Sequence, residues 1–461
     1  MIQIKRVASA LMAIVLTASI AGCSSPSGTG ASSASVTSAP ASSAAASSSA
    51  SDGKVATVSM LTFTDWYKDG WKALENYINQ NSAQLGFKLD IQKIAGGSQG
   101  EDVVKARFAT GDLPDIIQSY GAKWIDTQVN GLDKMVDMGT LPSESEYDSK
   151  VLQEGGYLYK GKLYGMPIDT TNLLGVFYNK KVFQKAGITE VPKSWSAFLA
   201  DCAKIKAAGK TPLYYSGKDS WTLQCFTHFG FNKEVFDSKE TYTQFWDKMN
   251  TNKRHYADCK NFANAIKLSK DMIDKGYVNS TYLSDTYDMA QTALAKGDAG
   301  MYVNATWVID EITSKYPNAV ADIGAFPLPL YDDAENYTDS SLPGAIGITT
   351  SCKNVEAAKK AIDFISSSKG QQIYASAQPG IYLNKKVSVK LPAATQDLAD
   401  VMKAGKEIAL WQGTGNNYGY GAYDKFLQDY YVGDKTVEAV LKAMDDETAK
   451  NAVAANDPNW K

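Results

Sequence analysis

Aromatic residues stand beside short polar residues at several points of this sequence, and such pairs can bind a ligand without reacting with it. Asp65 precedes Trp66, and Asp219 lies two residues before Trp221. Carboxylates and amides exchange hydrogen bonds with hydroxyl groups, and an aromatic face packs flat against C–H groups. A sugar carries both kinds of surface. The pairs therefore predict carbohydrate contacts.

Three of these candidates have a second interpretation that the sequence leaves open. Asp65 could instead cap the N-terminus of a helix that holds Trp66 in its first turn. Gln99 lies in a glycine-rich segment, residues 96–100, which could approach a ligand or form a plain loop. That segment is not a phosphate loop, because no Gly-Lys-Ser/Thr follows it. Tyr120 follows an expected strand and could line a cleft or be partly buried.

The acid and base chemistry available to the chain is limited. His228 and His255 are its only histidines, which argues against a histidine-rich zinc site, and we expect no metal or cofactor. A secreted glycosidase is an alternative, because it needs two carboxylates about 5–10 Å apart. Asp65, Asp169 and Asp219 could supply such a pair, but no motif supports one. We therefore expect a binding protein and not an enzyme.

The composition indicates a globular protein. The 461 residues suffice for two to four domains, and 44% are hydrophobic against 21% charged. A net charge of -3 excludes the basic balance of a nucleic-acid-binding protein. Four cysteines after residue 53 lack CxxC spacing, so a redox or metal motif is not expected, and a disulfide among them stays open: Cys202, Cys225, Cys259 and Cys352.

The N-terminus resembles a bacterial lipoprotein signal. A short basic start precedes an apolar run over residues 7–20, and Ile-Ala-Gly-Cys ends at Cys23. We expect residues 1–22 to be a signal peptide and Cys23 to carry the lipid, the alternative being an ordinary secretory signal. Residues 23–53 are rich in serine and alanine and should form a flexible tether with a mean reach of ~30 Å.

The folded part begins with alternating strand and helix patterns. Residues 55–63 are nearly all apolar, like a buried strand, and Phe87, Leu89 and Ile91 alternate with polar residues. A helix around residues 76–84 separates them. A further helix should open at Glu101 and end before a strand at residues 115–117. This β-α-β-α-β order predicts an α/β fold with a largely parallel sheet.

The same pattern returns later in the chain. Ser194 can cap a helix that Gly209 ends, with Cys202 on its apolar side, and Asn354 can cap another. Residues 437–454 should form a C-terminal helix. No run of membrane-spanning length follows Cys23.

Several segments, taken in order, resemble the sugar-binding family of extracellular solute-binding proteins of ABC importers, which is related to maltose-binding protein. The resemblance covers nearly all of the folded part. The segments that carry it are residues 108–116 (FATGDLPDI), 161–167 (GKLYGMP), 177–180 (FYNK), 183–187 (FQKAG), 192–195 (PKSW), 297–307 (GDAGMYVNATW), 354–365 (NVEAAKKAIDFI) and 370–374 (GQQIY).

The resemblance implies a two-lobe, periplasmic-binding-protein-like α/β fold with three hinge crossings and a ligand cleft between the lobes. Lobe one would contain residues 55–174 and 327–378, and lobe two residues 175–326 and 379–461. It further implies a monomer that captures a carbohydrate and delivers it to the membrane subunits of an ABC permease. The lipid at Cys23 would be its only link to the membrane, on the outer face.

The resemblance also adds candidate ligand contacts. Asp169 and Asn172 precede the first crossing, and Trp307, after Asn304, stands where the family commonly keeps a sugar-stacking tryptophan. Two later loops supply Gly344, through backbone N–H groups near it, and Trp411. The many aromatic residues favour an oligosaccharide, and a polyamine is the alternative ligand.

Overall fold

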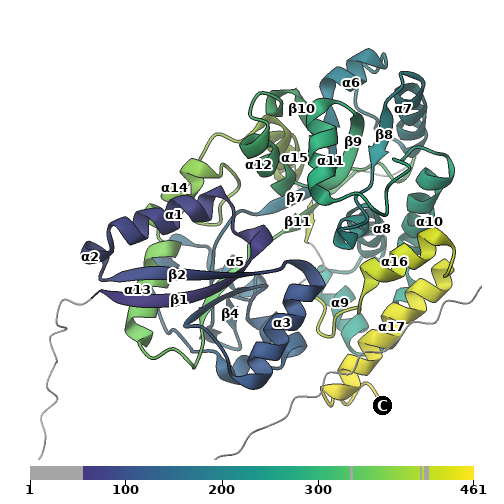
Figure 1. The fold of residues 1–461 in the computed structure, drawn as a ribbon. Helices are drawn as coiled ribbons and strands as arrows, with labels where there is room; N and C mark the ends of the chain where they lie inside the picture. The colour runs from purple at the N-terminus through teal and green to yellow at the C-terminus, as the bar shows by residue number, and fades with distance from the viewer. Residues whose placement is uncertain (1–54, 333–335, 405–406, 410–414) are drawn as a thin grey trace, which may run out of the picture. The chain divides into compact units, whose positions relative to one another are not determined.

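The computed structural model of the chain describes residues 55–332, 336–404, 407–409 and 415–461. Residues 53–461 form one compact unit, whose described residues contain two large β-sheets, each with its own helices (Figure 1). We call these two halves lobe one and lobe two. The predicted signal peptide, Cys23, the predicted tether and Trp411 lie outside the described residues.

The sheet of lobe one confirms the predicted order at the start of the folded part. β1 is parallel to β2 and β3, and β12 is antiparallel to β3 and β6. Met60, Ile116 and Ile346 are fully buried in these strands, as expected for apolar runs. The strands run in the order β2 (Phe87–Ile94), β1 (Ala56–Phe63), β3 (Ile116–Ser119), β12 (Ala345–Ile348) and β6 (Met166–Pro167).

Helices from two distant parts of the chain cover this sheet. The first helices pack beside α14 and α13, which come more than 250 residues later (Figure 1). A small hairpin, β4 (Leu158–Tyr159) and β5 (Lys162–Leu163), completes the lobe. The helices are α1 (Asp69–Gln80), α2 (Ser82–Leu85), α3 (Gly97–Thr110), α4 (Ala122–Trp124), α5 (Ser149–Glu154), α13 (Val355–Ser366) and α14 (Ser368–Ala377).

α3 begins one turn before the predicted start at Glu101. Gly96 occupies the N-cap position with extended backbone angles, and the segment predicted as a glycine loop forms the first turn of the helix. Glycine is accepted at a helix N-cap without a side-chain hydrogen bond. Gln99 is therefore an exposed helical residue and not part of a loop.

Lobe two is built on a mixed sheet around β7. β7 is antiparallel to β9, β10 and β11, whereas β8 is parallel to β9. β9 is buried along its whole length. The strands are β7 (Asn172–Asn179), β8 (Thr211–Tyr214), β9 (Ala299–Ala305), β10 (Ile323–Phe326), β11 (Thr338–Ser341) and β13 (Glu407–Ala409).

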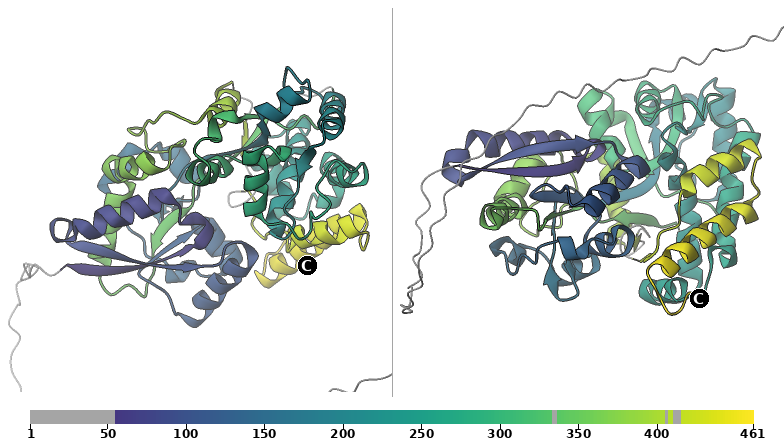
Figure 2. Two further views of the ribbon diagram at one scale, coloured as in Figure 1. Left: turned by 45° about the horizontal axis from the view of Figure 1, so that its top comes forward. Right: turned by 60° about the horizontal axis from the view of Figure 1, so that its bottom comes forward.

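The helices of lobe two confirm the predicted signals. Ser194 Oγ accepts from the N–H of Ala197 at the start of α7, and the last helix spans residues 437–454 as predicted. α16 and α17 lie side by side in each view (Figure 2). The helices are α6 (Lys180–Lys185), α7 (Trp195–Ala207), α8 (Gln224–Asp237), α9 (Tyr242–Asn250), α10 (Lys260–Asp274), α11 (Tyr287–Lys296), α12 (Trp307–Lys315), α15 (Ala393–Lys403), α16 (Tyr423–Val432) and α17 (Val437–Ala454).

The chain passes between the two sheets three times: from β6 to β7, from β11 to β12, and from α14 to α15. The second passage differs from the predicted return to lobe one at residue 327. β11 pairs with β7, so that Ser340 stands opposite Leu173, and the change of sheet falls on residues 342–344. The prediction missed this because β11 is a short strand of polar residues without an apolar pattern.

The described residues contain no helix that is long and apolar enough to cross a membrane. They also contain no group of three or more histidine, cysteine or acidic residues placed to hold a metal ion. Cys202 is buried on α7, which confirms its prediction as a small core residue. It and the other three described cysteines are free thiols.

Candidate ligand cleft

A cleft of about 1130 Å³ lies between the two lobes. Lobe one contributes the short helix η1 (Thr64–Trp66), the start of α3 and residues that follow β3. Lobe two contributes residues of η5 (Ser220–Leu223), α11, α12 and α17, and residues 416–424. The first two passages between the sheets form its floor.

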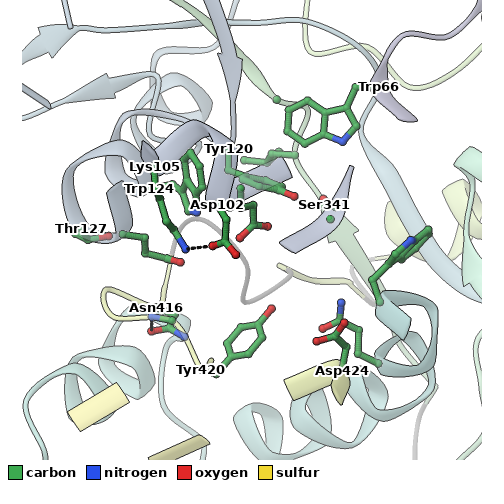
Figure 3. Close-up of a pocket in the computed structure, with 18 of the residues that line it drawn as sticks. Trp66, Asp102, Lys105, Tyr120, Trp124, Thr127, Ser341, Asn416, Tyr420 and Asp424 are labelled. Atoms are coloured by element: carbon green, nitrogen blue, oxygen red, sulfur yellow. Dashed lines mark hydrogen bonds and ion pairs between the residues drawn. The ribbon is translucent and has the colours of Figure 1, made fainter. Parts of the chain in front are cut away.

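Aromatic side chains form the wall of lobe one. Trp66 lies edge to face on Tyr120, with ring centroids 4.9 Å apart, and Tyr120 packs on Trp124 at 5.3 Å. Figure 3 shows these three side chains together at one side of the cavity. Trp66 reaches it because the chain turns directly after β1 into η1. The alternative role of Asp65 as a helix cap is wrong, since Lys68 occupies the N-cap position of α1.

The absence of a side chain at Gly344 leaves room for the indole of Trp66. A Cβ on residue 344 would lie 2.8 Å from Cζ3 of Trp66 and 3.1 Å from the carbonyl oxygen of Ser119. The carbonyl of Gly344 accepts from the N–H of Ile168 at 3.0 Å. Gly344 therefore lines the cleft and also lets the indole pack directly over the backbone of the second passage.

Lobe two supplies a second aromatic wall. Trp221 packs against Tyr287 with ring centroids 5.2 Å apart, and against Trp307 at 6.0 Å. Trp307 is the first residue of α12, directly after β9, and Trp221 is in η5. Both tryptophans are half-buried and line the cleft. In each lobe, therefore, a tryptophan within one turn after a strand lines the cleft: Trp66 after β1 and Trp307 after β9.

Asn304 and Asp219 support this wall and do not line the cleft. Asn304 is fully buried, and its Oδ1 accepts from Nε1 of Trp307 at 2.5 Å. Asp219 Oδ2 accepts from the N–H of Tyr287 at 2.7 Å, at the start of α11. Each side chain therefore positions an aromatic residue that faces the cavity.

Replacing Asn304 with alanine is expected to weaken ligand binding about fivefold. The change removes the acceptor that orients Trp307, and one such hydrogen bond contributes about 0.5–1.5 kcal/mol, a factor of about 2–13 in affinity. Calorimetric titration of a ligand of the protein measures the effect, with the Tm recorded for each variant. Wild-type affinity in a folded Asn304→Ala protein would show that Trp307 needs no such support.

A charged network lies at the floor, beside the first passage. Lys68 Nζ is 3.8 Å from Asp169 Oδ2 and 3.9 Å from Oδ2 of Asp310 on α12. The lysine and both carboxylate side chains are little exposed, at 14%, 11% and 11%. Gln378 Nε2 donates to Asp169 Oδ1 at 2.8 Å. Lys68 of lobe one therefore contacts both Asp169 in the first passage and Asp310 of lobe two.

The backbone of the first passage is held by the same residues. Asp169 has a φ of +86°, a conformation that aspartate tolerates better than most residues. Its Oδ1 accepts from the N–H of Thr170 at 2.7 Å. Asn172 Oδ1 accepts from Oγ1 of Thr306 at 3.1 Å, which ties the start of β7 to lobe two. Asp169 and Asn172 both line the cleft.

Burial and neighbouring charge shift the pKa values in this network. Burial raises the pKa of Asp310 to about 8; Lys68 opposes the rise, and Asp169 adds to it. Burial lowers the pKa of Lys68, but the nearby carboxylates, Asp169 and Asp310 first among them, outweigh this and raise it overall. Lys68 is therefore charged over the whole neutral range.

The raised pKa of Asp310 predicts a pH-dependent stability. An unfolded chain loses this proton near pH 3.8 and the native state near pH 8, so the free energy of unfolding falls as the pH rises between these values. Asp310→Asn should remove that part of the decline. Urea unfolding of both proteins from pH 4.5 to 8.5 tests it: the wild type should lose stability relative to Asp310→Asn. Parallel curves would contradict the shift.

The family model of bacterial extracellular solute-binding proteins matches residues 47–372. The chain belongs to this family.

Relatives of this solute-binding protein include a multiple sugar-binding protein of Streptococcus mutans, 24% identical over 272 residues. That match covers 59% of the chain and 63% of the relative. A probable sugar-binding periplasmic protein of Mesorhizobium japonicum is 26% identical over 426 residues, covering 85% of the chain and 94% of the relative.

Solved structures confirm the predicted two-lobe fold. A chitin oligosaccharide binding protein superposes with a TM-score of 0.72 at 18% identity, covering 86% of this chain and all of that one. The solute-binding protein RafE in complex with raffinose gives a TM-score of 0.65 at 19% identity, with the same coverage.

Within the solute-binding protein, eight predicted contacts line the cleft, three do not, and one lies outside the described residues. Gln99, Asp219 and Asn304 are not among the lining residues, and Trp411 lies outside the described part. The eight that line it are Asp65, Trp66, Tyr120, Asp169, Asn172, Trp221, Trp307 and Gly344.

Several lining residues were not predicted. Glu311 follows Trp307 by four residues on α12, and this helical spacing could have revealed it. Tyr287 on α11, Tyr420 and Asp424 had no such signal. Figure 3 shows Tyr420 and Asp424 across the cavity from the aromatic wall of lobe one. The positions of Tyr420 and Asp424 depend on how the C-terminal helices pack on lobe two.

Proposed function

We propose that this solute-binding protein captures a carbohydrate in the cleft and delivers it to the membrane subunits of an ABC permease. The observation that carries the proposal is the pair of aromatic walls, one from each lobe, around a cavity with polar side chains. Aromatic faces suit the C–H surfaces of a sugar ring, and the carboxylates and amides suit its hydroxyls. The similarity to a multiple sugar-binding protein and to a probable sugar-binding periplasmic protein supports it.

The volume of the cleft favours an oligosaccharide. Pockets for drug-sized ligands are typically about 300–1,000 Å³, and this cleft has about 1130 Å³. Trp66 and Trp307 belong to different lobes, so a chain of several rings can contact both. A ligand that contacts both lobes favours the arrangement in which they are close together. No covalent step is part of this mechanism.

Thermal unfolding of the mature chain, residues 23–461, tests the proposal against mono- and oligosaccharides, polyamines and dicarboxylates. A ligand that binds only the native state adds about 2.7 kcal/mol of stability at one hundred times its Kd. We expect a rise in Tm with one class of sugar. A rise with a polyamine or an acid and none with any sugar would overturn the carbohydrate assignment.

One of the three carboxylates considered for a glycosidase has a structural role instead. Asp219 binds the backbone of Tyr287 and does not line the cleft. We therefore infer capture without catalysis. Incubation with a panel of chromogenic glycosides should release no product, and measurable turnover would contradict the inference.

We infer that Cys23 is lipidated and becomes the first residue of the mature chain, which the lipid would hold at the outer face of the cytoplasmic membrane. We also infer that the protein is a monomer. The signal-like sequence before Cys23 supports the lipidation. Metabolic labelling with a palmitate analogue should tag the wild-type protein and leave Cys23→Ser unlabelled. Equal labelling of both proteins would contradict lipidation at Cys23.

A further inference from the structure

The cleft carries an excess of negative charge. Eight carboxylates and three lysines line it, and the described lining contains no arginine. A carbohydrate without charge needs hydrogen-bonding groups, and uncharged amides and hydroxyls would serve it as well as carboxylates. The negative charge of the cleft is therefore greater than a neutral ligand requires.

The three lining lysines are already paired. Lys68 lies between Asp169 and Asp310, as described above. Lys105 Nζ is 3.6 Å from Asp102 Oδ1, the pair drawn as a dashed line in Figure 3. Lys450 Nζ is 3.2 Å from Oε2 of Glu447. Lys68 also acts on Asp65, and Lys105 on Glu101, but each of these lysines is paired with another carboxylate.

Two further lining carboxylates are paired with lysines outside the cleft. Asp126 Oδ2 is 2.6 Å from Lys160 Nζ, and Glu311 Oε2 is 3.1 Å from Lys315 Nζ. Three carboxylates then have no lysine or arginine nitrogen within 4.0 Å among the described residues: Asp65, Glu101 and Asp424.

These three carboxylates come from both lobes. Asp65 is in η1 and Glu101 on α3 of lobe one, and Asp424 is on α16 of lobe two. Asp424 Oδ2 accepts from Ser220 Oγ at 2.5 Å, and Lys425 reaches that serine, not the carboxylate, at 2.8 Å.

Like charges of the two lobes act on one another across the cavity. Burial raises the pKa of Asp65, and Glu311 and Asp219 of lobe two raise it further. Burial also raises the pKa of Glu101; Lys105 and a hydrogen bond with Tyr120 oppose the rise, and repulsion from Asp102 and Asp424 adds a smaller part. A positive charge between the lobes would turn this repulsion into attraction on both sides. Trp66 and Tyr120 beside these groups offer ring faces that also attract cations.

We propose that the ligand of this cleft is a carbohydrate that carries a protonated amino group. This inference rests on the proposed function and specifies its substrate class. The aromatic walls hold the ring faces, and Asp65, Glu101 and Asp424 hold the ammonium group. An amine could also come from a linear polyamine, which has no ring face to pack on the tryptophans.

The test compares sugars that differ only in charge. The Kd of mature residues 23–461 is measured by calorimetry for the β-1,4-linked glucosamine trisaccharide and for cellotriose, which has hydroxyls in place of the amines. Kanamycin and maltotriose extend the comparison to α-linked sugars, and spermidine represents the polyamines. We expect at least one amino sugar to bind tenfold or more tightly than its neutral counterpart, with the advantage shrinking as NaCl rises from 20 to 500 mM.

Charge variants locate the effect. The Glu101→Gln, Asp424→Asn double variant should reduce the advantage of the amino sugar at least fivefold. Asp90→Asn, on the exposed side of β2, is the control and should leave it unchanged. An equal loss in the control would show a general charge effect and overturn the assignment to the cleft.

The outcomes separate the two proposals. Tighter binding of a neutral sugar, or equal binding of both members of a pair, would overturn the charged-ligand inference and leave carbohydrate capture standing. Binding of spermidine alone, or of no member of the panel, would overturn both.

Discussion

Replacing Trp307 with alanine is expected to weaken ligand binding by well over tenfold while the protein stays folded. Trp307 is half-buried, lines the cleft and packs against Trp221. Truncation of a tryptophan at the centre of a binding surface commonly reduces affinity by 2 kcal/mol or more, about thirtyfold. Calorimetric titration measures it, and Trp221→Ala should act in the same direction.

Phe236 provides the matched control. It lies on α8 of the same lobe, is 41% exposed and packs on Tyr337, away from the cleft lining. Phe236→Ala removes a similar ring from the surface and should leave the affinity unchanged. Wild-type affinity in both tryptophan variants would remove Trp221 and Trp307 from the site. An equal loss in Phe236→Ala would point to a general effect on the fold.

The Lys68→Met variant should lose about 3–5 kcal/mol of unfolding free energy at pH 8.5, because it leaves two buried carboxylates without their cation. Asp169 and Asp310 would then repel one another at the hinge. The loss should be smaller at pH 6, where Asp310, with its pKa of about 8 in the wild type, can stay protonated. Urea unfolding at both pH values measures the difference.

Lys72 allows a direct control one turn along the same helix. Its Nζ lies 2.8 Å from Asp69 Oδ1, but both side chains are well exposed, at 56% and 40%. Lys72→Met should change the stability by at most about 1 kcal/mol. Adding Asp310→Asn to Lys68→Met should restore most of the lost stability. A loss that is equal in both lysine variants, or independent of pH, would contradict the role of Lys68.

The regular elements could be predicted because local patterns determine them. The apolar run of β1, the alternation in β2 and the cap Ser194 depend on residues close together in sequence. The passage from lobe two to lobe one could not be placed, because β11 is identified by its pairing with β7 and not by its own composition. Its residues, TDSS, are typical of a loop.

The aromatic residues of the site could be predicted better than the polar ones. A tryptophan that follows closely after a strand is expected at the surface or in a cavity. Trp66 and Trp307 both line the cleft. A short polar side chain can bind a ligand or the backbone with equal ease. Asp219 accepts from the backbone of Tyr287 and Asn304 from the indole of Trp307, and only the folded structure reveals these partners.

The position of β12 in the sheet of lobe one determines when that lobe can fold. β12 lies between β3 and β6, yet β3 ends at residue 119 and β12 begins at residue 345. At about 5–20 residues per second, tens of seconds of synthesis separate the two strands. During that time β3 has an open edge and β6 lacks its partner in the sheet, and open strand edges pair readily with other chains. The lobe that begins first in the chain therefore receives one of its central strands only after most of the other lobe.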